Sequence, residues 1–209
     1  MSQYVTAKQM KEIEYQAYMQ GIPYLTMMEN AGKSAFKKIV NTYPLQGKLV
    51  VVLVGKGNNG GDGYVVARYL KKTGCMVLVI MAEGLPVTDD AKTNFQRCTD
   101  QKIEVVNYEP GITEFMLDGA DYIIDAIYGA GFHGRFREPI DAIARKVNES
   151  DAKVIALDLP SGLNADTGEA DPHAISADLT ITFARWKLAH NTTNGQRLCG
   201  ESILTDIGI

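Results

Sequence analysis

Cysteines are few in this sequence, and no two of them are close enough to suggest a shared site. Cys75, Cys98 and Cys199 are odd in number and form no Cys-x-x-Cys pair. This spacing argues against a disulfide framework and against a cysteine zinc site, so we expect free thiols in a reducing compartment. The first residues are polar and lack a basic region followed by an apolar run, so we expect no secretory signal and a cytoplasmic location.

Long hydrophobic runs and clusters of basic residues are also absent. The longest apolar run, from Leu49 to Val54, is far too short to cross a bilayer. The net charge of -4 gives no electrostatic reason to expect a nucleic acid or an anionic membrane as a partner. With 45% hydrophobic and 22% charged residues the composition is that of an ordinary globular protein, and we expect a single domain over residues 1–209.

The beginning of the chain predicts two helices ahead of any strand. Thr6 can cap a helix that runs to roughly Gly21, where glycine and the proline two residues later stop it. A second helix is expected from near Thr26 to Tyr43, with apolar residues along one side. Two opening helices suggest an extension packed on the core or a surface for self-association.

An alternation of strands and helices follows. The continuous apolar run from Lys48 to Val54 is typical of a strand buried on both faces of a parallel sheet. A glycine-rich loop, a helix over 63–72 and a strand over 76–81 complete a β-α-β unit. Further helices are expected over 89–102, 112–117 and 139–148, and further strands over 103–106, 122–127, 153–157, 179–183 and 202–206. This order predicts an α/β fold whose mostly parallel sheet has helices on both faces.

The segments after each strand are the candidate sites, because ligands of open α/β sheets bind beyond the carboxyl ends of the strands. In the first segment, Gly55, Gly57 and Gly60 fit the pattern Gly-x-Gly-x-x-Gly. Glycines permit positive φ and close backbone approach, and the following helix N-terminus can bind a phosphate. The alternative is a tight turn without a ligand. The loop lacks the lysine of a Walker motif, and Glu83 fits only loosely the spacing of a ribose-binding acid.

A second glycine-rich segment follows the expected strand at 122–127. It contains Gly129, Gly131 and Gly134, and Arg135 directly after them can pair with a phosphate through two hydrogen bonds. His133 is a candidate acid or base, although a single loop histidine is more often a bystander. The other histidines and the cysteines lack the spacing of a metal site.

Two carboxylates stand at the ends of expected buried strands. Asp125 and Asp158 each need a partner or a function there, and the alternative for Asp158 is a structural cap of the following turn. With Asn59 and Ser161 nearby in the expected fold, the set offers only oxygen ligands, which suits a hard cation. Sodium, potassium, magnesium, calcium and the absence of any ion all remain open at this point.

Several blocks of the chain together resemble the NAD(P)HX epimerases, the family of YjeF N-terminal domains. The resemblance covers nearly the whole chain, and the Asn-Asn-Gly-Gly-Asp-Gly and Asp-Leu-Pro-Ser-Gly blocks, in this order, are its most specific part. The matching blocks are Met28–Gly32, Gly57–Gly63, Asp125–Gly131, Asp158–Leu163, Asp166–Gly168, Ala177–Phe183 with Lys187, and Asp206–Gly208.

The resemblance implies a three-layer αβα Rossmann-like sandwich with two N-terminal helices, often dimeric, with one potassium ion per subunit. It implies an isomerase that interconverts the R and S forms of NADHX and NADPHX, the hydrated forms of NADH and NADPH. This reaction supplies the S form to a dehydratase in cofactor repair. Because the chain ends at Ile209, we expect the dehydratase to be a separate protein.

The resemblance also implies roles for residues, carried over by position. Asn59, Asp125 and Ser161 are the implied potassium ligands. The implied substrate contacts are Asn58, Asn59, Gly60, Gly61, Asp62, Gly129, Ala130, Gly131, Phe132, His133, Gly134, Arg135 and Asp158. Inversion of the hydrated carbon requires proton transfers that a carboxylate can supply, so our hypothesis is that Asp158 is the catalytic acid and base.

Two other functions stay open on the sequence alone. One is a binding module without catalysis, against which the retained glycine loop and Asp158 argue. The other is a different nucleotide enzyme, such as a kinase or an NAD-dependent oxidoreductase. The missing Walker lysine argues against a kinase, and the poorly placed ribose carboxylate argues weakly against an oxidoreductase.

Overall fold

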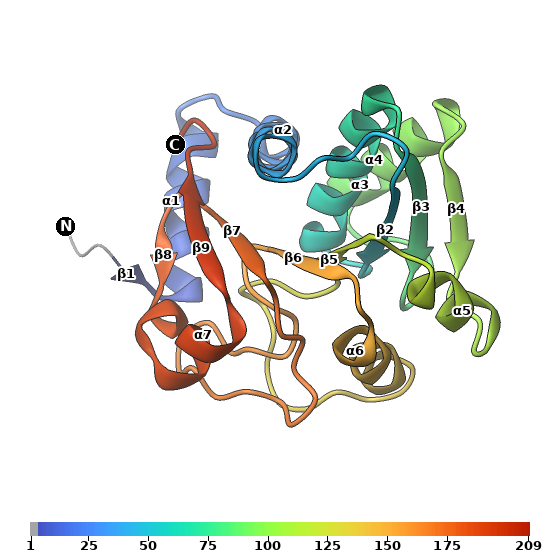
Figure 1. Cartoon of the computed structure of the whole chain (residues 1–209). Coiled ribbons are helices and arrows are strands. Elements are labelled where there is room, and N and C mark those ends of the chain that lie inside the picture. The colour runs from blue at the N-terminus through green and yellow to red at the C-terminus, as the bar shows by residue number, and fades with distance from the viewer. Residues whose placement is uncertain (1–3) are drawn as a thin grey trace.

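The computed structural model describes residues 4–209 and centres on a sheet of seven strands (Figure 1). The strands are β2 (Leu49–Val54), β3 (Met76–Met81), β4 (Glu104–Asn107), β5 (Tyr122–Ala126), β6 (Lys153–Leu157), β7 (Leu179–Phe183) and β9 (Glu201–Thr205). They lie in the order β4-β3-β2-β5-β6-β7-β9, and every neighbouring pair is parallel. The predicted mostly parallel sheet is therefore confirmed.

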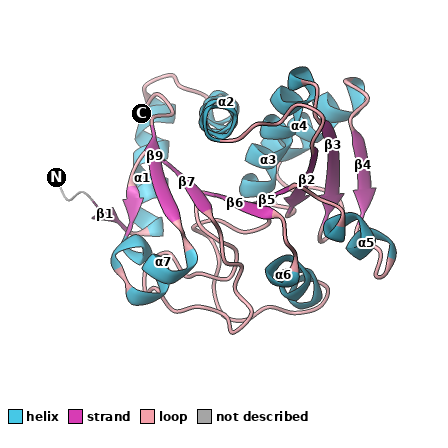
Figure 2. Cartoon of the chain, in the orientation of Figure 1, coloured by secondary structure: helices cyan, strands magenta, loops and turns pink. Residues whose placement is uncertain are grey.

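Helices cover both faces of the sheet, which makes three layers (Figure 2). One face carries α2 (Tyr24–Thr42), α3 (Asn58–Leu70) and α4 (Asp89–Asp100), and the other carries α5 (Ile112–Asp118) and α6 (Ile140–Glu149). Val50 and Val52 of β2 belong to the core under the first group, whereas Val51 and Leu53 belong to the core under the second. This burial on both faces explains why the apolar run is continuous. The predicted three-layer α/β fold is confirmed.

The N-terminal segment packs beside the C-terminal strands. α1 (Ala7–Met19) begins at a capping box formed by Thr6 and Gln9, and β1 (Tyr4–Val5) ahead of it pairs in parallel with β8 (Trp186–Lys187). The remaining short elements are two 3-10 helices, Lys71–Thr73 and Leu188–Asn191, and α7 (Thr193–Leu198). The two opening helices are confirmed. β1, β8 and α7 had no counterpart among the predicted elements, because such short elements show no periodicity. No helix within the described residues is both long and apolar enough to cross a membrane.

The start of α3 differs from the prediction. The helix begins at Asn58, so Asn58 to Gly63 form its first turns and not a loop. None of the glycines in this segment has a positive φ. A Cβ atom at Gly60 would lie 2.0 Å from the Gly55 carbonyl oxygen, and one at Gly63 would lie 2.6 Å from the Ala126 Cβ. These glycines therefore allow the helix to pack closely on the ends of β2 and β5.

The strand order reverses between β2 and β5. From β2 the chain builds outward through β3 to β4, and it then returns to β5 and builds through β6 and β7 to β9 on the other side. The loops that leave β2 and β5 run in opposite directions, so a crevice opens between them at the carboxyl ends of the strands.

Candidate active site

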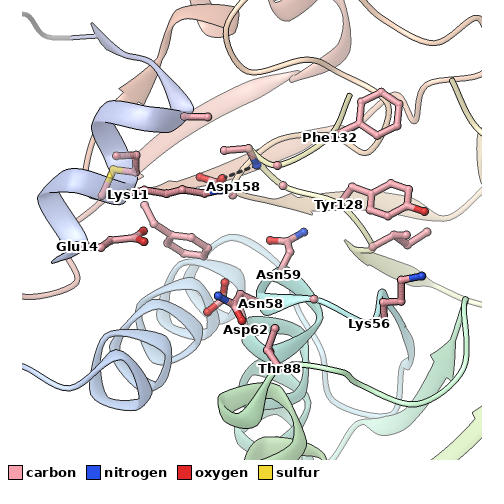
Figure 3. Close-up of a pocket in the computed structure, with 18 of the residues that line it drawn as sticks. Lys11, Glu14, Lys56, Asn58, Asn59, Asp62, Thr88, Tyr128, Phe132 and Asp158 are labelled. Atoms are coloured by element: carbon pink, nitrogen blue, oxygen red, sulfur yellow. Dashed lines mark hydrogen bonds between the residues drawn. The ribbon is translucent and has the colours of Figure 1, made fainter. Parts of the chain in front are cut away.

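A cavity of about 480 Å³ lies at this reversal point (Figure 3). Its walls come from α1, the start of α3, the loop after β3, the loop after β5, and the residues that follow β6 and β7. In Figure 3, Lys11 and Glu14 of α1 stand on one side, and Tyr128 and Phe132 stand on the opposite side. The segments that follow the strands thus meet along one edge of the sheet, as the sequence predicted.

The N-terminus of α3 opens onto this cavity. Its N-cap residue is Gly57, and no side chain caps the helix. Asn58, Asn59 and Asp62 line the cavity, whereas the two glycines between them are buried in packing contacts. A helix N-terminus carries a positive partial charge and backbone N–H donors, which together favour a bound phosphate. The predicted phosphate turn is therefore a helix N-terminus at the cavity wall.

Asp158 follows β6 and lines the cavity with a backbone φ of 67°. Aspartate is among the few residue types that adopt this conformation readily. Its Oδ2 accepts a hydrogen bond from the Ala130 N–H at 3.0 Å, and its Oδ1 accepts one from the Thr182 hydroxyl at 3.2 Å. The Nζ of Lys187 forms a close ion pair with Oδ1. Groups from the β5 loop and from the β7–β8 segment therefore fix the direction of the carboxylate.

Lys187 is a buried cation whose side chain is only 1% exposed. Besides Asp158, its ammonium group donates to the Thr182 hydroxyl at 3.1 Å and to the Phe183 carbonyl at 3.0 Å. Three acceptors thus satisfy its three donors, which a buried charge requires. Lys187 was not among the predicted site residues, although it closes one of the resembling blocks. The turn that points it inward includes Ala184 at a φ of 58°, which only the fold reveals.

Three carboxyl groups of the cavity have pKa values shifted in different directions. Burial tends to raise the pKa of Asp158, but the charge of Lys187 and the hydrogen bonds to the carboxylate outweigh it and hold this pKa below its usual value. Burial, together with the charges of Asp158 and Glu14, raises the pKa of Asp62 well above its usual value. Burial and the charge of Asp158 also raise the pKa of Glu14. An ionised carboxylate beside carboxyl groups that favour the proton is an arrangement for acid and base catalysis.

The glycine loop after β5 divides between this cavity and two neighbouring ones. Residues 129–132 line the main cavity. His133 lines an adjacent cavity of about 420 Å³, Gly134 lines another of about 390 Å³, and Arg135 lines both of these. The Arg135 guanidinium also donates to the Ala170 carbonyl at 3.2 Å. The structure therefore places the second half of this predicted contact segment outside the main cavity, on its margin.

Asp125 and Ser161, two of the predicted cation ligands, form a buried cluster behind the cavity. The Asp125 carboxylate accepts hydrogen bonds from the Ser161 hydroxyl at 2.6 Å and from the Ser161 N–H at 2.7 Å. The Tyr128 N–H donates to the Ser161 hydroxyl at 2.9 Å. The third predicted ligand, Asn59, lies against the loop after β5. A Cβ atom at Gly129 of that loop would lie 3.1 Å from the Asn59 Oδ1.

This cluster has two features that fit a cation. Asp125 is fully buried, and no lysine, arginine or histidine among residues 4–209 forms an ion pair with it. Burial raises the pKa of Asp125 to about 6. The Nδ2 of Asn59 is buried without a partner, and a rotation of the amide would place its oxygen there. A buried carboxylate without a basic partner and an unpartnered amide form an oxygen-rich donor set.

Most of the chain matches a known protein family. The family model described as the YjeF-related protein N-terminus matches residues 25–189 of the 209. The chain belongs to this family. The match runs from α2 to the residues just after β8, so it includes every wall of the cavity except α1.

Individual relatives of this YjeF-family chain agree with that assignment. It is 36% identical over 206 residues to the NAD(P)H-hydrate epimerase of Limosilactobacillus fermentum, which covers 98% of this chain and 96% of the relative. It is 36% identical over 210 residues to the bifunctional NAD(P)H-hydrate repair enzyme Nnr of Pyrobaculum aerophilum, and spans only 42% of that longer protein. The crystal structure of yeast YNL200c superimposes with a TM-score of 0.84 at 26% identity, covering 97% of this chain and 87% of the yeast chain.

The wall contributed by α1 was missed by sequence reasoning. Met10, Lys11 and Glu14 line the cavity from this helix. Nothing in an ordinary amphipathic helix indicates that it faces a ligand site. Its position depends on long-range contacts, among them the β1–β8 pairing and a 2.6 Å hydrogen bond from the Ala7 N–H to Asp166. These contacts join α1 and β1 to segments far away in the sequence, so no pattern of neighbouring residues could predict them.

Proposed function

We propose that this protein is an NAD(P)H-hydrate epimerase that interconverts the R and S forms of NADHX and NADPHX. The observation that carries the proposal is the ion pair of Asp158 with buried Lys187, in the same cavity as the uncapped N-terminus of α3. This arrangement supports a base and a phosphate-binding site that act in one cavity. The relatives named above are an epimerase and a bifunctional repair enzyme, which supports the same activity.

The reaction needs one group to accept a proton and another to donate one. The hydrate carries a hydroxyl on the carbon next to the ring nitrogen. In a ring-opening route, Asp158 accepts the hydroxyl proton, the carbon–nitrogen bond breaks to leave an aldehyde, and Asp62 protonates the released nitrogen. Rotation presents the other face of the aldehyde, and ring closure returns both protons to the groups that held them. Loss and return of water needs the same two kinds of proton transfer.

The opposite pKa shifts support these two roles. Lys187 favours the ionised form of Asp158, whereas burial and neighbouring negative charge favour the protonated form of Asp62. Both side chains line the cavity. Glu14, whose pKa is also raised, lines the same cavity from α1 (Figure 3), and its charge strengthens the preference of Asp62 for its proton.

The substrate contacts follow from the walls of the cavity. In the proposed complex the diphosphate lies at the start of α3, against Asn58 to Asp62, and the hydrated ring lies near Asp158. The residues at 129–132 contact the part of the substrate inside the cavity, and the margin at His133, Gly134 and Arg135 contacts the part that extends beyond it. The division of this loop among three cavities supports an elongated ligand.

A potassium ion completes the proposed site, held by Asn59, Asp125 and Ser161. The ion would supply a positive charge that neutralises the buried Asp125 carboxylate and ties the loop after β5 to the start of α3. The absence of a basic partner for Asp125 in residues 4–209 and the unpartnered Asn59 amide support this assignment. The ion would hold the loop after β5 against the start of α3 and would take no part in the proton transfers.

We also propose that the protein is cytoplasmic, forms a homodimer and works with a dehydratase that uses the S form. Three free buried cysteines support a reducing compartment. The bifunctional repair enzymes among the relatives support the coupling to a dehydratase. The chain spans about two fifths of the length of those relatives. Tyr15, Tyr18, Met19 and Tyr24 are exposed on α1 and the start of α2, which supports self-association there. Multi-angle light scattering tests the dimer, and a monomer at micromolar concentration would contradict it.

A coupled assay tests the proposed activity. Purified R-NADHX is mixed with a dehydratase that uses only the S form, and NADH formation is followed with and without this protein. We expect the protein to accelerate NADH formation in proportion to its concentration. No acceleration by folded protein would exclude the epimerase and favour a binding module.

A further inference from the structure

Glu83 occupies a position in this fold that the proposed activity does not explain. It lies two residues beyond the end of β3, at the same edge of the sheet as the α3 N-terminus, and it lines both the main cavity and the adjacent one of about 420 Å³. β3 is the direct neighbour of β2 and follows it through α3. In parallel β-α-β units that bind dinucleotides, an acidic residue at the end of this second strand contacts a ribose.

The Glu83 carboxylate is only half satisfied. Its side chain is 18% exposed, and the Nζ of Lys56 approaches its Oε1 at 3.9 Å. Its Oε2 is buried and has no hydrogen bond of good geometry. The Tyr128 hydroxyl lies nearby, and burial together with the Glu83 carboxylate raises the pKa of that hydroxyl. A buried polar group left in this state destabilises the fold, and more so if it is charged. At the wall of the cavity, this oxygen remains available to accept a hydrogen bond from a ligand.

A second unpartnered group lies on the same loop. The Thr88 hydroxyl is also buried without a partner, and Thr88 also lines the main cavity. The loop that carries both residues is tied to the turn after β2 by a 2.9 Å hydrogen bond from the Val87 N–H to the Lys56 carbonyl. Glu83 and Thr88 therefore belong to one loop that is fixed next to the phosphate-binding end of α3.

The chemistry of these groups selects a ligand. A carboxylate only accepts hydrogen bonds, so its partner must donate, and a hydroxyl such as that of Thr88 can do either. A vicinal diol offers two donors at the spacing of one carboxylate. We propose that Glu83 binds the 2′,3′-diol of a ribose of the dinucleotide substrate, with Thr88 beside it. This inference rests on the proposed function for the identity of the dinucleotide.

The substrate carries two riboses, and both have this chemistry in NADHX. In NADPHX the adenosine ribose has a 2′-phosphate, which would place more negative charge beside a carboxylate. If Glu83 binds the adenosine ribose, the enzyme prefers NADHX, and the preference falls when Glu83 is neutral. If Glu83 binds the nicotinamide ribose, replacing Glu83 weakens the binding of NADHX and NADPHX equally.

Calorimetric binding of mononucleotides to the full chain tests the inference without any turnover. The probes are AMP, nicotinamide mononucleotide and their 2′-deoxy analogues. We expect wild-type protein to bind one of the ribonucleotides at least tenfold more tightly than its deoxy analogue. Glu83→Gln should remove most of this difference, while Glu104→Gln on the exposed edge strand β4 should leave it unchanged.

The outcomes separate this inference from the proposed function. The inference is supported if wild-type protein binds the ribonucleotide more tightly than its deoxy analogue and Glu83→Gln abolishes this difference. This holds even if the protein fails to epimerise R-NADHX. The nucleotide that shows the difference identifies which ribose is bound, and the ratio of KM values for NADHX and NADPHX gives an independent check. Equal affinity of wild-type protein for each ribonucleotide and its deoxy analogue, or no binding of either ribonucleotide, would overturn the inference without requiring a stable variant.

Discussion

The two sides of the strand reversal contribute different properties to the same cavity. The β4-β3-β2 side supplies the uncapped N-terminus of α3 and the loop of residues 82–88. The β5-β6-β7 side supplies buried charge, namely Asp125 and the Asp158–Lys187 pair. Backbone donors stay in place without a ligand, whereas a buried charge requires compensating partners. Except at Asp62, the proposed proton donor on α3, changes on the first side should therefore affect mainly binding, and changes on the second should affect chemistry and folding together.

The strongest test of this comparison is Asp158→Asn. We expect kcat for R-NADHX to fall by roughly 100–10,000-fold with little change in KM, because a positioned proton-transfer group contributes on this scale. Asparagine tolerates the positive φ at this position, so the backbone should be preserved. Asp151→Asn, in the exposed turn before β6, is the matched control. Wild-type kcat in Asp158→Asn would show that the reacting carboxylate lies elsewhere.

Lys187→Met should show that folding and chemistry are coupled on this side. It leaves Asp158 buried without its cation, and breaking such a pair destabilises by about 3 kcal/mol. Because Lys187 lowers the native pKa of Asp158, the stabilisation is present above the unfolded pKa of about 4 and is lost as the pH falls through the native pKa.

The measurements for Lys187→Met are urea unfolding and a pH–rate profile. The stability difference from wild type should be larger at pH 7 than at pH 4, and the acid limb of the profile should move to higher pH. Adding Asp158→Asn to Lys187→Met should restore part of the lost stability, since both charges are then gone. Additive losses in the double variant would mean that the pair is not coupled.

On the first side, Gly60→Ala and Gly57→Ala distinguish close packing from backbone flexibility. The Cβ at Gly60 would lie 2.0 Å from a backbone oxygen, so we expect a loss of about 2 kcal/mol, typical of overpacking, and weaker substrate binding. The Cβ at Gly57 meets nothing within 4 Å, so Gly57→Ala should be nearly neutral. Thermal melts and KM values report both effects. Equal behaviour of the two variants would contradict the packing role.

The smallest expected effect is that of potassium on stability. At ten times its dissociation constant, a bound ion stabilises by about 1.4 kcal/mol, which should raise Tm by about 3–5 °C for a chain of this size. The comparison is potassium chloride against choline chloride at equal ionic strength. Asp125→Asn should lose the difference, because it removes the buried charge that the ion balances. The same Tm in both salts would argue against the ion.

Most of the fold was predictable because its signals are local. The continuous apolar run of β2 indicates burial on both faces, and the structure shows alternate residues packed into two cores. The predicted bounds of β3, β6 and β7 coincide with the observed ones. The observed start of α3 at Asn58 lies ahead of the predicted start at Gly63, because glycines after a strand are typical of a loop. In the folded chain they are helical, and they serve contacts with residues distant in the sequence.

The site divides along the same line. The strand ends that carry Asp125 and Asp158 and the turn that opens α3 could be predicted from the sequence, because each depends on neighbouring residues. Long-range packing alone brings Lys187 to Asp158, closes the cavity with Glu14 of α1, and leaves an oxygen of Glu83 unpartnered. Those arrangements join segments far apart in the chain, and their energy comes from burial and charge pairing that exist only once the core has packed.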